Sequence, residues 1–178
     1  MNITANLPPL SAQAIELIEY GLLVLSGRDD DSEWNLLDQV GAMRAISRER
    51  KALGMSLWDV EERSGVSLNS AYYWLAGNRH PAISNLVALA ETVGFEVVMR
   101  SKSRREVFYN LVDLRPAMAA LDHARRERAL TTKKLRALTS VASNSFYAWL
   151  KQERTPTLEK FAALVEALGF ELIMQRKC

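Results

Sequence analysis

The chain has 178 residues, 48% hydrophobic and 25% charged, with a formal net charge of +2, values that are ordinary for a globular protein. No apolar run approaches the roughly 20 residues of a membrane-spanning helix, and residues 1–9 lack the basic and apolar regions of a signal peptide. The only cysteine is Cys178, and with two histidines this argues against an intrachain disulfide or a His/Cys zinc site. We therefore expect a cytoplasmic protein with no metal and no cofactor.

The first segment, residues 1–32, is predicted to contain one helix and an acidic linker. Apolar residues recur at helical spacing over 11–25, and the break at 27–32 includes three consecutive aspartates. Residues 1–40 carry a net charge of −6, so the rest of the chain carries +8. This helix has no counterpart later in the chain. It either packs on the domain that follows or serves as an oligomerisation or partner-binding helix.

The rest of the chain contains one pattern twice, at an offset of 75 residues. NSAYYWL at 69–75 returns as NSFYAWL at 144–150, and GFE at 94–96 returns at 169–171. A repeat of this length at a fixed period indicates two copies of one small domain. We place the first domain and its terminal strand at 33–102, a linker or extra strand at 103–114, and the second domain and its strand at 115–178.

Each copy is predicted to consist of four helices followed by a strand. In the first copy, apolar spacing and glycine stops predict helices over 33–53, 56–64, 67–76 and 81–93. After Gly94 the composition changes to that of a strand at 95–100, which returns as a strand at 170–175. Between the copies, residues 107–112 are compatible with two structures. They form either a strand that pairs back on 95–100 or the start of the next helix.

Two consecutive short helices in each copy have the pattern of a helix-turn-helix. In this motif the first helix braces against phosphates and the second lies in the major groove. The tight turn falls at residues 64–67, while Trp74 and its counterpart Trp149 are predicted to point into the core. We expect a mostly α protein with tandem, five-helix-like helix-turn-helix domains.

The run from Gly65 to Trp74, followed by GNRHP at 77–81 and by Leu86 and Leu89, resembles the Cro/CI-type (XRE) helix-turn-helix family. The resemblance covers both copies, and the terminal strands are similar to those of antitoxin-type repressors. It implies that the strands after the two domains pair in a small antiparallel sheet. The chain would then be a covalent pseudo-dimer whose two recognition helices enter successive major grooves, about 34 Å apart. The implied function is sequence-specific binding of double-stranded DNA and transcriptional regulation. Repression is favoured over activation because occlusion needs no further contacts.

The resemblance also assigns roles to individual side chains on each recognition helix and beside it. The base-reading positions are Leu68, Asn69, Tyr73, Ser143, Asn144 and Ala148. An asparagine suits adenine through two hydrogen bonds, worth about 1–3 kcal/mol of discrimination. The phosphate-contact positions are Ser67, Ser70, Arg79, Thr132, Lys133, Lys134, Ser145, Lys151 and Arg154. Tyr72 and Tyr147 fit either packing or a phosphate contact.

The two copies depart differently from the family pattern. The first has Leu57 at the phosphate-clamping position and acidic side chains at 59, 61 and 62, which phosphates repel. It carries a net charge of +2 over 44–102, whereas the second copy carries +5 over 119–177. The second copy therefore fits DNA binding better than the first. Arg50 and Arg125 lack the family's glutamate partner late in the recognition helix, which predicts that they are freed for phosphate.

Two other classes of function were weighed against DNA binding. The alternative is an antitoxin-like or antiactivator-like protein-interaction module in which one repeat has reduced or lost DNA binding. A homodimer through the N-terminal helix or the terminal strands is compatible with either function. No spacing of residues supplies a nucleophile, base and orienting group, so we expect no enzyme.

Overall fold

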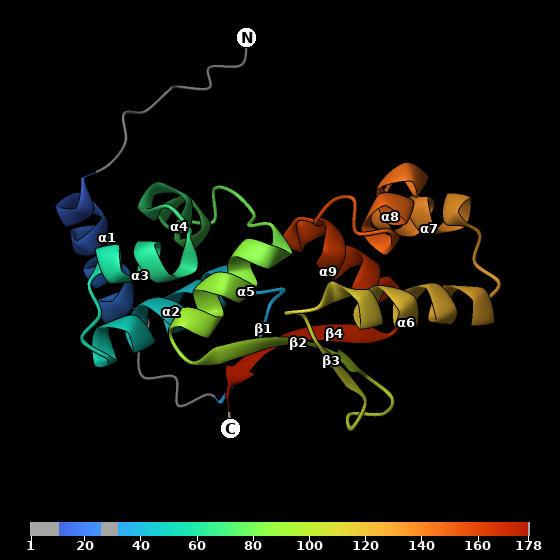
Figure 1. Ribbon diagram of the computed structural model, residues 1–178, viewed down its shortest axis with the longest axis horizontal. Helices are drawn as coiled ribbons and strands as arrows, with labels where there is room; N and C mark the ends of the chain where they lie inside the picture. The colour runs from blue at the N-terminus through green and yellow to red at the C-terminus, as the bar shows by residue number, and fades with distance from the viewer. Residues whose placement is uncertain (1–10, 26–31, 178) are drawn as a thin grey trace, which may run out of the picture.

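The computed structural model describes residues 11–25 and 32–177 (Figure 1). The acidic stretch at 26–31 and Cys178 lie outside the described residues. The elements in chain order are α1 (Ala12–Leu25), β1 (Glu33–Asn35), α2 (Gln39–Ala52), α3 (Leu57–Ser64), α4 (Leu68–Leu75), α5 (Ile83–Thr92), β2 (Phe95–Ser101), β3 (Phe108–Asn110), α6 (Leu114–Glu127), α7 (Thr132–Thr139), α8 (Ser143–Leu150), α9 (Leu158–Ala167) and β4 (Phe170–Arg176). The predicted fold class, mostly helical with a small antiparallel sheet, is confirmed. No helix in the described part is long and apolar enough to cross a membrane.

The four strands form one antiparallel sheet in the order β1-β4-β2-β3. Its centre is the pairing of β2 with β4, in which Val98 lies opposite Ile173. These two residues are 75 positions apart, the repeat offset, so a pseudo-two-fold axis passes between them. The helices lie on one face of the sheet (Figure 1).

The two repeats exchange their first strands. β1, which precedes the helices of the first repeat, pairs with β4 of the second repeat, and β3 pairs with β2 in the symmetric way. A second symmetric contact joins the N termini of the fourth helices, where Ile83 N donates to Pro156 O at 2.9 Å and Leu158 N donates to Pro81 O at 2.8 Å. The repeats therefore share one sheet and one continuous hydrophobic core.

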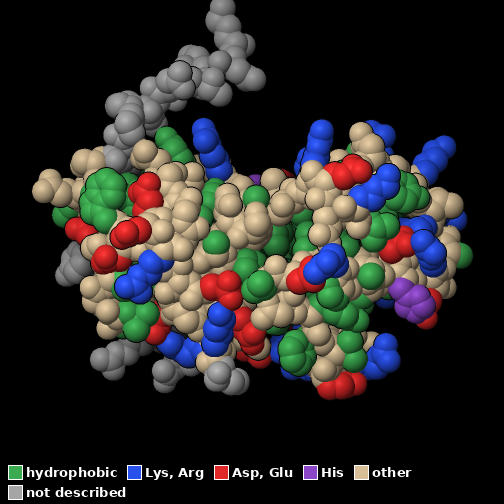
Figure 2. All heavy atoms as spheres, viewed as in Figure 1, with side chains coloured by type: hydrophobic (Ala, Val, Ile, Leu, Met, Phe, Trp, Pro, Cys, Tyr) green, Lys and Arg blue, Asp and Glu red, His purple; other side chains and the backbone are tan. Residues whose placement is uncertain are grey.

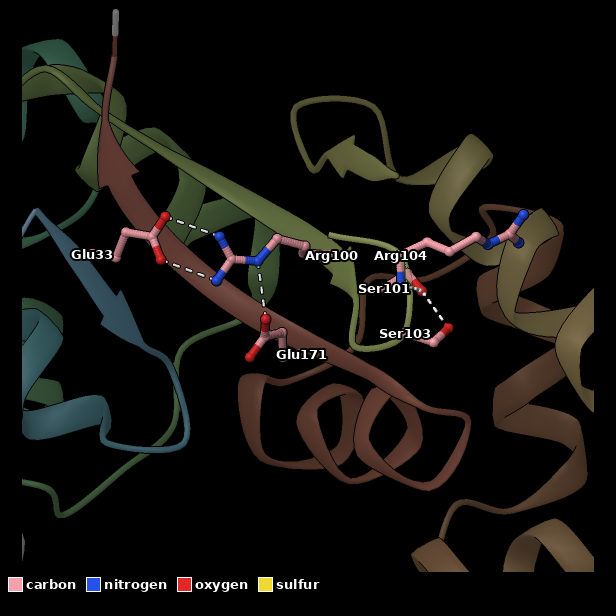
Figure 3. Close-up of polar contacts among 6 residues, drawn as sticks. All are labelled: Glu33, Arg100, Ser101, Ser103, Arg104 and Glu171. Carbon is pink, nitrogen blue, oxygen red and sulfur yellow. Dashed lines mark hydrogen bonds and ion pairs between the residues drawn. The ribbon is translucent and has the colours of Figure 1, made fainter. Parts of the chain in front are cut away.

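Arg100 fastens the exchanged strand β1 to the middle of the sheet (Figure 3). Its guanidinium donates to both carboxylate oxygens of Glu33, at 2.9 and 3.0 Å, and its Nε donates to Glu171 on β4 at 2.9 Å. The hydrogen bond from Arg100 lowers the pKa of Glu33 below its ordinary value. One arginine thus links three neighbouring strands, β1, β4 and β2.

The core is built from the apolar stripes that the sequence shows. Trp74 and Trp149 are buried, as predicted, and Phe146, Phe161 and Phe95 are almost fully buried. On β2, the side chains of residues 95, 97 and 99 are buried, and on β4 residues 172 and 174 are buried and Phe170 is partly buried. The helices of both repeats therefore pack on one shared apolar face of the sheet.

Two sequence expectations about element boundaries are settled by strand pairing. The helix predicted to begin at Glu33 begins at Gln39, where Asp38 accepts a hydrogen bond from Gly41 N. The preceding residues form β1 because Trp34 pairs with Met174 and packs edge-on against Phe95, with ring centroids 5.1 Å apart. Of the two alternatives for 107–112, the strand is correct, since β3 pairs with β2.

The N-terminal helix α1 packs against α2 and α4 of the first repeat, and Ile15 is its most buried described side chain. This is the first of the two alternatives considered for this helix. The packing makes the first repeat different from the second, since α8 has no such helix against it among the described residues.

Candidate nucleic-acid interface

Both repeats contain a helix-turn-helix of the same geometry. In each, an eight-residue helix is followed by a tight turn and a second eight-residue helix, α3 and α4 in the first repeat and α7 and α8 in the second. The turn needs a residue in the left-handed conformation, which is Gly65 at φ 69° and Ser140 at φ 58°. The following valines, Val66 and Val141, are buried and anchor the turn to the core.

The second helices of the two motifs face the same side of the molecule. In Figure 1, α4 and α8 lie along the upper side, with α5 and α9 between them and the sheet below. The pseudo-two-fold axis relates the two helices. An elongated ligand running along the upper side would therefore meet both of them.

The predicted base-reading residues of α4 are only half exposed. Leu68, Asn69 and Tyr73 are all partly buried. The Tyr73 ring lies under the Arg79 guanidinium, whose Cζ is 4.7 Å from the ring centroid. The hydroxyl of Ser67 accepts from Ser70 N and also bonds the Ser70 hydroxyl at 2.9 Å. The two serines predicted to contact phosphate are therefore bonded to one another.

Of the predicted base-reading residues of α8, one is more exposed to solvent than its counterpart on α4. Asn144 is exposed, whereas Ser143 and Ala148 are partly buried. The Oδ1 atom of Asn144 accepts from Ser145 N at 2.9 Å. Ala142, the residue that precedes α8, makes no side-chain capping hydrogen bond. Tyr147 is 44% exposed, while its counterpart Tyr72 is partly buried.

The predicted phosphate contacts are concentrated in the second repeat. Lys133, Lys134, Lys151 and Arg154 are exposed, and Thr132 is half-buried at the start of α7. Lys151 lies 4.0 Å from the Glu153 carboxylate, which reduces the net charge beside it. Figure 2 shows Lys and Arg side chains along the upper right of the molecule and acidic side chains over α3 at the left.

The expectation that Arg50 and Arg125 are freed for phosphate is wrong. Arg50 is buried, and its Nη1 donates to the backbone oxygen of Met55 at 2.6 Å. Arg125 makes the equivalent bond to Leu130 O at 2.7 Å and also pairs with Asp122. Both arginines bond the loop between the first two helices of their repeat.

Two residues that bear on the interface, Trp58 and Arg136, were not singled out from the sequence, and the contact that Glu61 makes was not predicted. Trp58, at the start of α3, is 64% exposed and stands where the second repeat has Lys133. Glu61 accepts a hydrogen bond from Leu68 N, the first amide of α4, at 3.3 Å. Arg136 occupies the position equivalent to Glu61 and is exposed. Aligning the two copies at the offset of 75 residues would have revealed both differences, Trp58 against Lys133 and Glu61 against Arg136.

The described part of the chain contains no group of three or more His, Cys, Asp or Glu residues that could hold a metal ion. The two histidines lie near carboxylates, His80 at 4.0 Å from Glu159 and His123 at 3.2 Å from Glu127. His80 Nδ1 also bonds Gln39 Oε1 at 2.7 Å, and the Gln39 amide donates to the backbone oxygens of Trp74 and Arg79.

Comparison with known families identifies the first repeat. A helix-turn-helix family model matches residues 46–97, which run from within α2 to within β2. The match does not extend to the second repeat. No curated protein and no solved structure matches the chain. Residues 46–97 thus match a helix-turn-helix domain of the Cro/CI (XRE) type, a class of DNA-binding domain, which indicates DNA as a partner of the first repeat.

Proposed function

We propose that the protein is a sequence-specific, double-stranded DNA-binding regulator that represses transcription by occupying promoter DNA. The observation that carries the proposal is the symmetric arrangement of α4 and α8 on one side of the molecule (Figure 1). The helix-turn-helix match at 46–97 supports DNA as the ligand of the first motif. The second motif has the same order of elements and a more basic surface.

In this proposal each recognition helix enters one major groove, and the two grooves are successive ones on the same side of the duplex, about 34 Å apart. Asn69 and Asn144 read adenine through their amides, with Leu68, Tyr73, Ser143 and Ala148 contacting neighbouring base edges. Exposed lysines and arginines beside the helices hold the phosphates and set the register without reading sequence.

The shared sheet makes a single chain equivalent to a dimer. In the proposal, the pairing of β2 with β4 fixes the separation of α4 and α8, as the dimer contact does in two-subunit repressors. The two faces carry different side chains, with Leu68 and Tyr73 on α4 where α8 has Ser143 and Ala148. A single chain therefore prefers an operator with two unlike half-sites. A homodimer would restore symmetry over a longer operator.

The experiment that tests the proposal is a titration of the purified full chain with the duplex upstream of its own gene. Binding is measured at several salt concentrations, with an unrelated duplex as competitor. We expect competitor-resistant binding whose logarithm falls linearly with the logarithm of salt concentration. The double variant Lys133→Ala, Lys134→Ala should weaken binding to both duplexes and reduce the salt slope by about 2. Failure to bind any duplex at low salt would refute the proposal.

The second candidate function is a protein-interaction module in which one motif has lost DNA binding. The acidic side chains of α3 and the exposed Trp58 favour it, because exposed tryptophans are enriched at protein interfaces. The same titration separates the two functions. Salt-sensitive, sequence-selective binding to duplex DNA supports the first candidate, and its absence in a folded protein supports the second.

A further inference from the structure

The two motifs differ in charge at equivalent positions of α3 and α7: where α7 has a cation, α3 has a carboxylate at two positions and a tryptophan at a third. α3 carries Trp58, Asp59 and Glu61, and 75 residues later α7 carries Lys133, Lys134 and Arg136. The two motifs have helices of equal length and a left-handed residue at the same position of the turn, so the residues of each pair occupy equivalent positions in their motifs. A phosphate placed beside α7 would face Lys133, Lys134 and Arg136, and one placed beside α3 would face Asp59 and Glu61.

Glu61 has a contact that the other acidic residues of α3 do not share. Its Oε2 accepts a hydrogen bond from the Leu68 amide at 3.3 Å, which places a carboxylate at the N terminus of α4. The Ser67 hydroxyl accepts a hydrogen bond from the Ser70 amide, two residues further along α4. A carboxylate at this position stabilises the helix through its dipole but repels a DNA phosphate that approaches the same amides.

The recognition helix of the first motif is also less accessible to solvent than that of the second. α1 packs against α4, and Asn69 is partly buried where Asn144 is exposed. At the end of the molecule formed by α7 and α8, the exposed Arg136 stands at the position of Glu61. Three features therefore disfavour phosphate binding at the first motif relative to the second. These are the acidic side chains of α3, the Glu61 carboxylate at the N terminus of α4, and the packing of α1 against α4.

We infer that the protein grips DNA from one end, through α7 and α8, and that Glu61 is the residue that keeps a phosphate from the N terminus of α4. The inference rests on the proposed function and adds that the two motifs contribute unequally to DNA affinity. The second motif supplies the phosphate contacts and the affinity, and the first motif reads its half-site with a weaker hold. The orientation of the chain on an operator is then set by which half-site matches α8.

The test compares Glu61→Gln with Glu62→Gln in the full chain. Both variants remove one negative charge from α3, but only the Glu61 side chain bonds α4, and glutamine preserves an oxygen that accepts from Leu68 N. Arg136→Gln is the reciprocal variant in the second motif. The DNA is a duplex enriched by wild-type protein from a randomised pool. The readouts are affinity at about 50 and 200 mM salt and hydroxyl-radical protection of each half-site.

We expect wild-type protein to protect the half-site of α8 strongly and that of α4 weakly. Glu61→Gln should raise affinity roughly 2- to 5-fold at low salt and extend protection into the weak half-site, with a smaller change for Glu62→Gln. Arg136→Gln should lower affinity and reduce the salt slope by about 1. Thermal melting of each variant establishes that it is folded.

Two results would overturn the inference while leaving DNA binding intact. These are equal protection of both half-sites by wild-type protein, and equal gains from the Glu61 and Glu62 variants. If folded wild-type protein enriches no duplex and shows no salt-sensitive binding, the proposed function fails and the inference fails with it.

Discussion

At the scale of single residues, the two asparagines proposed to read bases occupy equivalent positions in unlike surroundings. Asn144 is exposed on α8, whereas Asn69 is partly buried on α4. We predict that Asn144→Ala weakens binding to the selected operator by roughly 10- to 100-fold, the loss of one two-bond contact to a base. Binding to an unrelated duplex should change little, because phosphate contacts supply that affinity. Competition binding with the two duplexes measures the difference.

Asn69→Ala is the matched control for this prediction. It removes the same side chain from the equivalent position, and we expect a smaller loss because the first motif holds DNA more weakly. A uniform loss on both duplexes after Asn144→Ala would contradict base reading and would mean that the side chain only supports α8. In that case the Asn144 side chain would act only through its Oδ1, which accepts a hydrogen bond from Ser145 N.

Residue roles were predictable where they follow from periodicity and unpredictable where they follow from a specific contact. Trp74 and Trp149 were predicted to be buried because their spacing places them on the apolar face of each recognition helix. Arg50 and Arg125 were misjudged because their bonds run to the backbone oxygens of Met55 and Leu130. A sequence pattern records which residues can bond, but the partner of a long arginine side chain depends on the loop geometry.

At the scale of elements, the exchanged strand β1 depends on its ion pair with Arg100 (Figure 3). The hydrogen bond from Arg100 lowers the pKa of Glu33, whose ordinary value is 4.5. A carboxyl with a lowered folded-state pKa stabilises the fold above its unfolded pKa, and this contribution is lost as pH falls through the folded value. We therefore predict that Glu33→Gln reduces stability near neutral pH by at most about 1 kcal/mol, since Glu33 is 43% exposed.

The pH dependence distinguishes this ion pair from a general effect of charge. The difference in stability between wild type and Glu33→Gln should be largest above pH 4.5 and should shrink as the medium becomes more acidic. Urea unfolding at a series of pH values measures it. Glu106→Gln, an exposed glutamate in the turn between β2 and β3, is the control for loss of one charge. A difference that stays constant down to strongly acidic pH would contradict the assignment.

The helices and the two long strands were predictable, but the short exchanged strands were less so. Glycine stops and apolar stripes mark α2 to α5 and their repeats, and the β-branched and aromatic content after Gly94 marks β2. β1 has only three residues, too few for an alternating pattern, and it is a strand because β4 lies beside it. An element that exists through a partner far along the chain leaves almost no local signal.

At the scale of the whole molecule, the pseudo-two-fold axis favours an operator with two symmetrically placed half-sites. The different side chains proposed to read DNA favour half-sites that differ in sequence. The shared sheet imposes symmetry on the positions of α4 and α8, while their side chains differ. We predict that wild-type protein enriches non-palindromic duplexes from a randomised pool. The triple variant Glu61→Arg, Leu68→Ser, Tyr73→Ala gives the first motif the second motif's residues at these positions. This variant should therefore enrich a duplex with two like half-sites in inverted orientation.

The same selection yields the separation of the half-sites, which tests the symmetric scaffold independently of the side chains. If the sheet holds the two recognition helices in successive major grooves, both proteins should select half-site centres one helical turn apart, about 10 base pairs. Thermal melting of the triple variant is needed because Leu68 is partly buried and Tyr73 stacks under Arg79. A folded triple variant that still selects unlike half-sites would show that residues outside these positions read the DNA. A variable spacing would show instead that the repeats move independently, contrary to the strand exchange that joins them.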